Sequence, residues 1–343
     1  MMRIGLIFGT RPEYLKIKPL FKALEDSSFE FRILQVNQHM DLDIEEKNHK
    51  WYRKICIEQT PNLTRLNDLA SHLPSALEHS IQECDSVLVQ GDTATAFFGA
   101  LTAFHLKKKI FHLEAGLRTF DLENPYPEEA YRSMISRIAN IHFCPDELSK
   151  QNLLRENIGS NIVVVGNSIL DLVKSYKKEC RIGSIVPITV HRRENWGAMS
   201  EIVSTIWRLA KKRNDLQFVW IYHPNPVLQK EIQTKINDLG YLENLHFQQP
   251  CSHEALCSYL HEAYCIITDS GGIQEEASFL GKFCFVLRKQ TERSSIPKDY
   301  IELVKDISLL EGLFDSKQIE LMRSCGVYGD GTTCSKIISY LNN

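Results

Sequence analysis

The stretch Thr268 to Glu276, with the sequence TDSGGIQEE, combines residue types that could hold a phosphate group. An apolar run ending at Ile267 precedes it and predicts a buried parallel strand, whereas the pattern from Ile273 to Leu280 predicts a helix. Ser270-Gly271-Gly272 would therefore lie at a helix start, where unpaired backbone N–H groups and a partial positive charge suit an anion. An ordinary glycine-rich turn would show the same string, so the neighbouring motifs must decide between the two interpretations.

Length and composition set the broad class of the protein. A chain of 343 residues is long for a single core and predicts two domains of ordinary size. A net charge of −3 gives no support for nucleic acid or an anionic membrane as a partner. The apolar run Ile4 to Phe8 is too short for a signal peptide, and no run approaches the roughly 18–20 apolar residues of a spanning helix. We therefore expect a cytoplasmic protein.

The ten cysteines stand in apolar contexts and form no CxxC pair. This pattern is typical of small core residues in a reducing compartment, so we expect neither a disulfide framework nor a metal site.

Short apolar runs alternate with helical patterns along the chain, which predicts parallel sheets built from right-handed crossovers. In the first half the predicted strands are 2–8, 31–36, 86–90, 110–113, 141–144 and 162–165. In the second half they are 185–190, 218–222, 245–247, 265–268 and 283–287. The polar segment Lys174 to Ser184 is the predicted link. The predicted fold class is therefore α/β, with two Rossmann-like doubly wound domains facing a cleft.

Unusual polar side chains follow the carboxyl ends of the predicted strands, where open parallel sheets bind ligands. They are Arg11, Asp92, Glu114, His191, His223 and Ser270. A structural histidine or a capping residue could explain any one of them, but six such residues together predict a binding site.

Several common catalytic classes have no support in the sequence. No GxGxxG follows a strand, and the P-loop, GxSxG and HExxH patterns do not occur, so we expect no cofactor. What remains is the phosphate-binding helix start, arginines that suit a diphosphate, and carboxylates that suit acid–base chemistry on a sugar. The pair Glu128-Glu129 has a second interpretation, because acidic residues after Pro127 also favour the start of a helix.

At this point the motifs resemble the non-hydrolysing UDP-N-acetylglucosamine 2-epimerases. The matching strings keep the family's order and span nearly the whole chain. They are GTRPE at Gly9 to Glu13, GDT at Gly91 to Thr93, EAGLRT at Glu114 to Thr119, PEEAYR at Pro127 to Arg132, HRRE at His191 to Glu194, DSGGIQEE at Asp269 to Glu276, TER at Thr291 to Arg293, and YGDG from Tyr328.

The resemblance implies a glycosyltransferase-B-like fold with two domains. The first would comprise residues 1–173, with the C-terminal helix 326–343 packing back on it, and the second, nucleotide-binding domain would comprise 174–325. It also implies reversible epimerisation of UDP-N-acetylglucosamine to UDP-N-acetylmannosamine for surface polysaccharide synthesis. The partners would be UDP-N-acetylglucosamine and UDP, with no cofactor, and we expect a homodimer.

The reaction implied is an elimination, because C2 of the sugar has no carbonyl beside it to acidify its hydrogen. UDP would leave C1, a proton would leave C2, and UDP would add back after protonation on the other face. The residues matching the family's catalytic set are Asp92, Glu114, Glu128 and His191. Those matching its substrate-binding set are Arg11, Lys16, Arg118, Arg132, Ser270, Gly271, Gly272, Glu276 and Arg293. The carboxylates are interchangeable candidates for the two faces of C2.

The chain departs from the family pattern at three places. Tyr131 replaces an asparagine, the segment Gln249 to Leu256 lacks the tyrosine-leucine pattern found near the uracil, and Met40 replaces the arginine of a QHR string. Because a thioether cannot pair with phosphate, Met40 predicts a weakened second, activating UDP-N-acetylglucosamine site. Three alternatives stay open: an epimerase of a modified UDP-N-acetylhexosamine, a UDP-sugar-dependent glycosyltransferase of the same fold, and a catalytically inactive sugar-nucleotide sensor.

Overall fold

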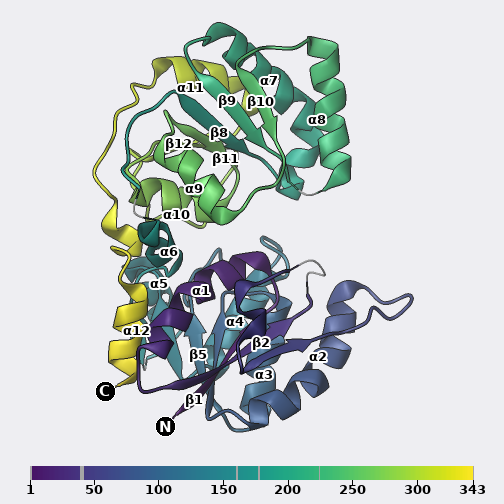
Figure 1. Cartoon of the computed structure of the whole chain (residues 1–343), viewed down its shortest axis with the longest axis vertical. Coiled ribbons are helices and arrows are strands. Elements are labelled where there is room, and N and C mark those ends of the chain that lie inside the picture. Colours follow the sequence, from purple (N-terminus) through teal and green to yellow (C-terminus); the bar gives the residue numbers. More distant parts are fainter. Residues whose placement is uncertain (1, 39–41, 160, 177, 224, 343) are drawn as a thin grey trace. The chain divides into compact units, whose positions relative to one another are not determined.

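The computed structural model describes residues 2–38, 42–159, 161–176, 178–223 and 225–342. The chain forms two compact units (Figure 1). Unit 1 comprises Met1–Leu172 and Tyr328–Asn343, and unit 2 comprises Val173–Val327. These limits differ by one or two residues from the predicted boundaries at 173 and 325. No helix among the described residues is long and apolar enough to cross a membrane.

Unit 1 contains a seven-stranded parallel sheet in the order β3-β2-β1-β4-β5-β6-β7. Its strands are β1 (Arg3–Phe8), β2 (Glu30–Val36), β3 (Tyr52–Ile55), β4 (Ser86–Gln90), β5 (Lys109–Leu113), β6 (Ile141–Cys144) and β7 (Ile162–Val164). Its helices are α1 (Arg11–Glu25), α2 (Arg65–Gln82), α3 (Ala94–His105), α4 (Glu128–Ile138), α5 (Glu147–Arg155) and α12 (Thr333–Leu341), while α6 (Ile169–Ser175) leads into unit 2.

Unit 2 contains a six-stranded parallel sheet in the order β10-β9-β8-β11-β12-β13. Its strands are β8 (Ile185–Thr189), β9 (Gln217–Ile221), β10 (Leu245–Gln248), β11 (Ile266–Thr268), β12 (Cys284–Val286) and β13 (Ile301–Leu303). Its helices are α7 (Met199–Lys212), α8 (Pro226–Leu239), α9 (His253–His261), α10 (Gly271–Phe279) and α11 (Leu310–Ser316).

All eleven predicted strands are confirmed, each within one residue at either end. The prediction missed β3 and β13, which are edge strands of the two sheets. Both are short and carry charged residues, such as Lys54 and Glu302, so neither shows the continuous apolar run of a central strand.

The central strands are buried on both faces because helices cover each side of the sheet. In β1, Leu6 and Phe8 pack toward α1 and α12, whereas Ile7 packs on the opposite face toward α2 and α3. This alternation follows from the two-residue repeat of a strand.

The C-terminal helix α12 belongs to unit 1, where it lies beside α1 (Figure 1). Asp171 fixes its start by accepting hydrogen bonds from the backbone N–H groups of Thr333 and Cys334, at 3.0 and 2.9 Å. The chain that leads into it is held by Asn167, whose N–H donates to the carbonyl of Tyr328 at 2.8 Å.

The strand order reverses once in each sheet, between β1 and β4 in unit 1 and between β8 and β11 in unit 2. At such a reversal the two following connections diverge to opposite faces and leave a crevice at the carboxyl edge. Arg11, Asp92, His191 and Ser270 follow these four strands, and Glu114 follows the neighbouring β5.

Candidate active site

At the reversal point of unit 1, side chains at the start of α1 cap the helix. Thr10 caps α1, and Glu13 reaches back to form a capping box. The buried Glu13 carboxylate accepts from Gly9 N (2.9 Å) and Thr10 N (2.7 Å), and from the Thr93 hydroxyl at 2.5 Å. Burial raises the pKa of Glu13 to about 7 against the effect of these hydrogen bonds. Glu13 therefore joins the loop after β1 to the loop after β4, and leaves Arg11 exposed in the first turn of α1.

Glu114, which directly follows β5, is held in a strained conformation. Its φ of 66° is in the left-handed region, which a non-glycine residue seldom adopts. Both carboxylate oxygens lie 2.6 Å from Lys16 Nζ, and Gln90 Nε2 donates to Oε2. The side chain is 7% exposed, so its orientation is fixed while an edge remains accessible.

Asp92 lies in the loop after β4, the strand that neighbours β5 in the sheet. Its Oδ2 is 2.5 Å from Arg132 Nη2 of α4. Gly91, with a φ of 69°, makes the turn that leads to it, and the Gly91 carbonyl accepts from His112 Nε2 at 2.8 Å. Complete burial lowers the pKa of His112 to about 3, so this imidazole is neutral and acts as a donor that positions the turn.

Glu128 and Glu129, at the start of α4, have different surroundings. Glu129 is buried, and its oxygens accept from the backbone N–H groups of Thr119 and Phe120 at 3.1 and 2.9 Å. It therefore holds the loop that follows EAGLR. Glu128 is the first residue of the helix and is partly exposed, which leaves it the better candidate for contact with a ligand.

Arg118 does not fit the substrate contact that the sequence predicted for it. Its side chain is 0% exposed, so a ligand cannot reach it in this arrangement. Its donors are used internally, by Glu156 at 2.5 Å, by Ser136 Oγ at 2.9 Å and by the carbonyl of Leu117 at 2.8 Å. Arg118 is a structural residue beneath the EAGLRT loop, and the reason for the error is that sequence does not reveal its partner Glu156.

In unit 2 the helix start after β11 is open. Ser270 occupies the N-cap position of α10, but its side chain makes no capping hydrogen bond. The preceding Asp269 does not cap the helix either. It is fully buried and accepts from the backbone N–H groups of His191 (2.9 Å) and Arg192 (2.8 Å) and from Asn195 Nδ2 (2.9 Å). Asp269 therefore joins the loop after β8 to the loop after β11.

Gly271 and Gly272, the two glycines of this turn, have different surroundings. A Cβ on Gly271 would lie 3.0 Å from Glu292 Oε1 and 3.3 Å from Arg293 Cζ, so close packing excludes a side chain there. A Cβ on Gly272 would have Ser270 Oγ, at 4.0 Å, as its nearest neighbour among the described residues. Gly272 thus keeps open the space in front of the helix start.

His191 lies at the same edge with its Nδ1 3.3 Å from Asp269 Oδ1. Its ring stacks on that of His223, with 5.5 Å between centroids. Burial lowers the pKa of His191, assisted by the charge of Arg192 and opposed by Asp269, so the neutral imidazole is favoured near neutral pH.

A cluster of arginines surrounds Glu292 beside the start of α10. The Glu292 carboxylate lies 2.6 Å from Arg288 Nη1, 3.2 Å from Arg293 Nη1 and 3.3 Å from Arg192 Nη2. Although burial acts to raise the pKa of Glu292, these three guanidinium groups hold it well below its usual range. The sequence prediction included Arg293 but missed Arg192, Arg288 and Glu292. Of the three missed residues, Arg192 is part of HRRE and Glu292 is part of TER, whereas Arg288 is in no motif.

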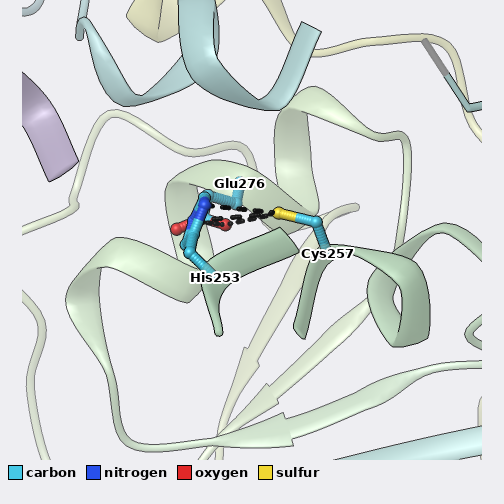
Figure 2. Close-up of side chains that lie close together, drawn as sticks. All are labelled: His253, Cys257 and Glu276. Atoms are coloured by element: carbon cyan, nitrogen blue, oxygen red, sulfur yellow. Dashed lines mark hydrogen bonds and ion pairs between the residues drawn. The ribbon is translucent and has the colours of Figure 1, made fainter. Parts of the chain in front are cut away.

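Glu276 lies one turn into α10 and is almost fully buried. Its Oε2 is 3.0 Å from His253 Nε2 and 3.6 Å from Cys257 Sγ, as Figure 2 shows. The sequence resemblance made Glu276 a ribose ligand and gave no role to its two neighbours. His253 falls in the segment where the family's tyrosine pattern is missing.

The predicted activating site lies mainly outside the described residues, because His39 and Met40 are not among them. The described neighbour Gln38 accepts from the backbone N–H and the hydroxyl of Thr95, at 3.0 and 2.8 Å. The effect of Met40 stays a prediction.

The sequence and the fold both match known proteins. The sequence profile of the family described as UDP-N-acetylglucosamine 2-epimerase matches residues 22–342. The UDP-N-acetylglucosamine 2-epimerase of Escherichia coli K12 is 33% identical over 376 aligned positions, which cover 100% of this chain and 99% of the relative. That of Campylobacter jejuni is 33% identical over 388 positions, with coverage of 99% and 97%.

Two solved structures show the same architecture. The UDP-N-acetylglucosamine 2-epimerase of Neisseria meningitidis bound to UDP-N-acetylglucosamine has a TM-score of 0.85 and 31% identity, covering 100% of both chains. The Methanocaldococcus jannaschii protein in complex with UDP-N-acetylglucosamine and UDP has a TM-score of 0.80 and 29% identity, covering 99% of each chain.

Proposed function

Because the chain belongs to the UDP-N-acetylglucosamine 2-epimerase family, we propose that it interconverts UDP-N-acetylglucosamine and UDP-N-acetylmannosamine. Solved relatives with the same α/β, glycosyltransferase-B-like fold carry UDP-N-acetylglucosamine, in one case together with UDP. The observation that carries the proposal is the fixed carboxylate of Glu114. A left-handed backbone and two polar partners hold it at the sheet edge to which Asp92 also belongs.

The chemistry proceeds by elimination and re-addition. The bond between C1 and the diphosphate oxygen breaks as a base removes the C2 proton, which yields UDP and a 2-acetamidoglucal. A proton then returns to C2 on the opposite face, and the diphosphate oxygen adds back to C1. Each half-reaction balances with UDP and one proton, and neither consumes an oxidant or a reductant.

The residues of unit 2 suit the departing diphosphate. The start of α10 lacks a side-chain cap, which suits its backbone N–H groups to an anion, and a Cβ at Gly272 would meet no described atom closer than 4.0 Å. Three arginines lie beside them as fixed donors, and Glu292, Glu194 and Glu275 balance their charge. Donors fixed before the reaction stabilise charge that develops on a leaving group. His191, favoured in its neutral form, lies at the same edge as a further polar contact.

The residues of unit 1 suit proton transfer at C2. Asp92, Glu114 and Glu128 are the candidate acid and base groups. Lys16 and Arg132 each hold one carboxylate within 2.6 Å, which fixes its direction and balances its charge. Two carboxylates on neighbouring strand ends could serve the two protonation steps, one on each face of the sugar.

The decisive experiment is proton NMR of UDP-N-acetylglucosamine incubated with the protein in deuterated water. We expect deuterium to enter C2 and both epimers to appear without any acceptor or added cofactor. An epimer that carries no solvent label would exclude the elimination. Tight binding without epimer or label would favour a sensor, and transfer of the sugar only when an acceptor is added would favour a glycosyltransferase.

The setting of the reaction is part of the same proposal. The enzyme acts in the cytoplasm as a homodimer and supplies a sugar nucleotide for polysaccharide synthesis. Ten free cysteines fit a reducing compartment. Exposed apolar side chains on α3 and α4, Phe104 and Met134, suit a contact between copies. Light scattering of the full chain tests the dimer, and a monomer at micromolar concentration would exclude it.

A further inference from the structure

Three side chains that ligate transition metals converge in unit 2 beneath the start of α10. His253 and Cys257 come from α9, and Glu276 comes from α10 (Figure 2). The Nε2 and Oε2 atoms are 3.0 Å apart, Sγ and Nε2 are 3.7 Å apart, and Sγ and Oε2 are 3.6 Å apart.

These distances are close to the edges of a tetrahedral zinc site. Bond lengths of about 2.0–2.1 Å for nitrogen, about 2.0–2.2 Å for oxygen and about 2.3 Å for sulfur place the ligand atoms about 3.4–3.6 Å from one another. The sulfur–oxygen distance of 3.6 Å falls in this range, and the sulfur–nitrogen distance of 3.7 Å exceeds it slightly. The nitrogen–oxygen edge needs to open by only a few tenths of an ångström.

The local sequence explains why the atoms converge. Ser252 caps α9 by accepting from Ala255 N at 3.2 Å, so the helix begins at His253. His253 and Cys257 are then four residues apart and lie on one face of the helix. Zinc-binding helices use the same spacing to present two ligands to one ion.

A second contact orients the imidazole. The Tyr176 hydroxyl lies 3.0 Å from His253 Nδ1. Without an ion, Nε2–H donates to the Glu276 carboxylate and Nδ1 accepts from the hydroxyl. With an ion bound, Nδ1–H would donate to the hydroxyl oxygen instead, which leaves the Nε2 lone pair for the metal. Metal-binding histidines have such a partner on the second ring nitrogen, which fixes the tautomer and the ring direction.

The three side chains are buried together. His253 is 8% exposed, Cys257 0% and Glu276 4%. Without an ion, hydrogen bonds satisfy the cluster, because Cys257 Sγ donates to Glu276 Oε2 at 3.6 Å and His253 Nε2 lies 3.0 Å from the same oxygen. A bound cation would displace the thiol proton and contact all three ligand atoms at once.

We propose that His253, Cys257 and Glu276 bind one divalent cation of the zinc type, with the fourth position taken by water or by a ligand oxygen. The mixed nitrogen, sulfur and oxygen set favours zinc over magnesium or calcium, which prefer oxygen alone. Three protein ligands with an open fourth position is the arrangement of accessible zinc sites. Glu276 also belongs to the predicted substrate-binding set, but the test measures the metal itself, so its failure is distinguishable from a failure of the proposed epimerase activity.

The test is a cobalt and zinc titration of the full chain after chelator treatment. We expect one equivalent of Co²⁺ to bind with a thiolate-to-cobalt charge-transfer band, and zinc to abolish that band. Cys257→Ser should remove the band. His253→Gln should weaken Co²⁺ affinity more than roughly 10–100-fold, which is the usual cost of losing a residue that only orients a metal ligand. Tyr176→Phe should fall within that 10–100-fold range. Cys56→Ser, which changes an exposed cysteine of unit 1, is the matched control and should bind as the wild type does.

X-ray absorption of the zinc-loaded wild type keeps the test decisive if a variant fails to fold. We expect one sulfur at about 2.3 Å with nitrogen and oxygen at about 2.0–2.2 Å. No saturable binding, a zinc shell without sulfur, or a cobalt band that survives Cys257→Ser but is lost in Cys56→Ser would each overturn the assignment.

Discussion

The two units use a buried carboxylate in the same way at the point where their strand order reverses. In unit 1, Glu13 accepts from the loop after β1 and from Thr93 after β4. In unit 2, Asp269 follows β11 and accepts from two N–H groups after β8. Each carboxylate therefore ties together two loops that a doubly wound sheet would otherwise let diverge.

The units differ in what happens to the helix that starts at this edge. In unit 1, Thr10 and Glu13 cap α1, and Thr93 caps α3 by accepting from Ala96 N at 3.1 Å. In unit 2, Ser270 leaves α10 without a side-chain cap. Capping uses the donors that an anion needs, so the uncapped helix is the one suited to phosphate.

The charges follow the same division. Unit 1 presents Asp92 and Glu114, each with one cationic partner, whereas unit 2 places three arginines around Glu292. One fold built twice thus offers acid–base groups in one copy and anion-binding donors in the other. The cap and the loop residues determine the difference, and the sheet does not.

The largest expected effect comes from the carboxylates of unit 1. Glu114→Gln, Asp92→Asn and Glu128→Gln should each lower kcat by ~10²–10⁴-fold, the usual cost of a lost general acid or base. Calorimetry should show affinity for UDP within a few-fold of the wild type, because the changes leave the proposed phosphate donors at the start of α10 and the side chain of Arg11 in place.

Glu147→Gln is the matched control, because Glu147 is exposed in the first turn of α5. It should leave both kcat and UDP affinity unchanged. Near-normal turnover of one of the three variants would remove that residue from the catalytic set, and a large loss of UDP affinity would break the division between the units.

A smaller effect is expected from the open helix start of unit 2. Gly272→Ala adds a methyl group that meets no protein atom closer than 4.0 Å, so the fold should tolerate it. The methyl group would lie where a phosphate approaches the backbone. We therefore expect Gly272→Ala to weaken UDP binding roughly 10–100-fold, because a lost charge-assisted contact costs about 1.5–3 kcal/mol.

Gly312→Ala in α11 is the control for this change, since a Cβ there also meets no atom within 4 Å. Calorimetry with UDP should separate the two variants. Equal UDP affinity in both would show that the open space before α10 is not a phosphate site.

The sequence predicted the central strands well because their apolar runs are continuous and buried on both faces. It missed two of the four edge strands, β3 and β13, where Arg53, Lys54 and Glu302 interrupt the pattern. Motif residues that follow strands, such as Asp92 and Ser270, were also placed correctly at the sheet edges.

Pairings between distant residues could not be predicted, because nothing local encodes them. Arg118 is paired with Glu156 and Arg293 with Glu275, and neither partner is adjacent to its arginine in the sequence. His253 and Cys257 did carry a signal in their four-residue spacing. The prediction of no metal site considered only the cysteines, and the approach of Glu276 to this pair became visible only in the fold.

The last predicted effect concerns acid stability. Unit 1 contains two fully buried histidines, and burial lowers the pKa of His112 to about 3 and that of His142 to about 4. In the unfolded chain both return to about 6.5. Between these values the unfolded state binds protons that the native state does not. Their contribution to stability is therefore present above about pH 6.5 and is lost as the pH falls toward 4 and then 3.

Each histidine should add up to about 1.4 kcal/mol per pH unit to the slope of unfolding free energy in this window. Hydrogen exchange of the full chain between pH 7 and 5, read by mass spectrometry, follows each unit separately. His112→Gln removes one titrating group while its amide can still donate to Gly91, so the slope for unit 1 should become shallower. His105→Gln, which changes an exposed histidine of α3, should leave the slope unchanged. If His112→Gln and the wild type lose stability equally with acid, the buried histidines of unit 1 are not the source of its pH dependence.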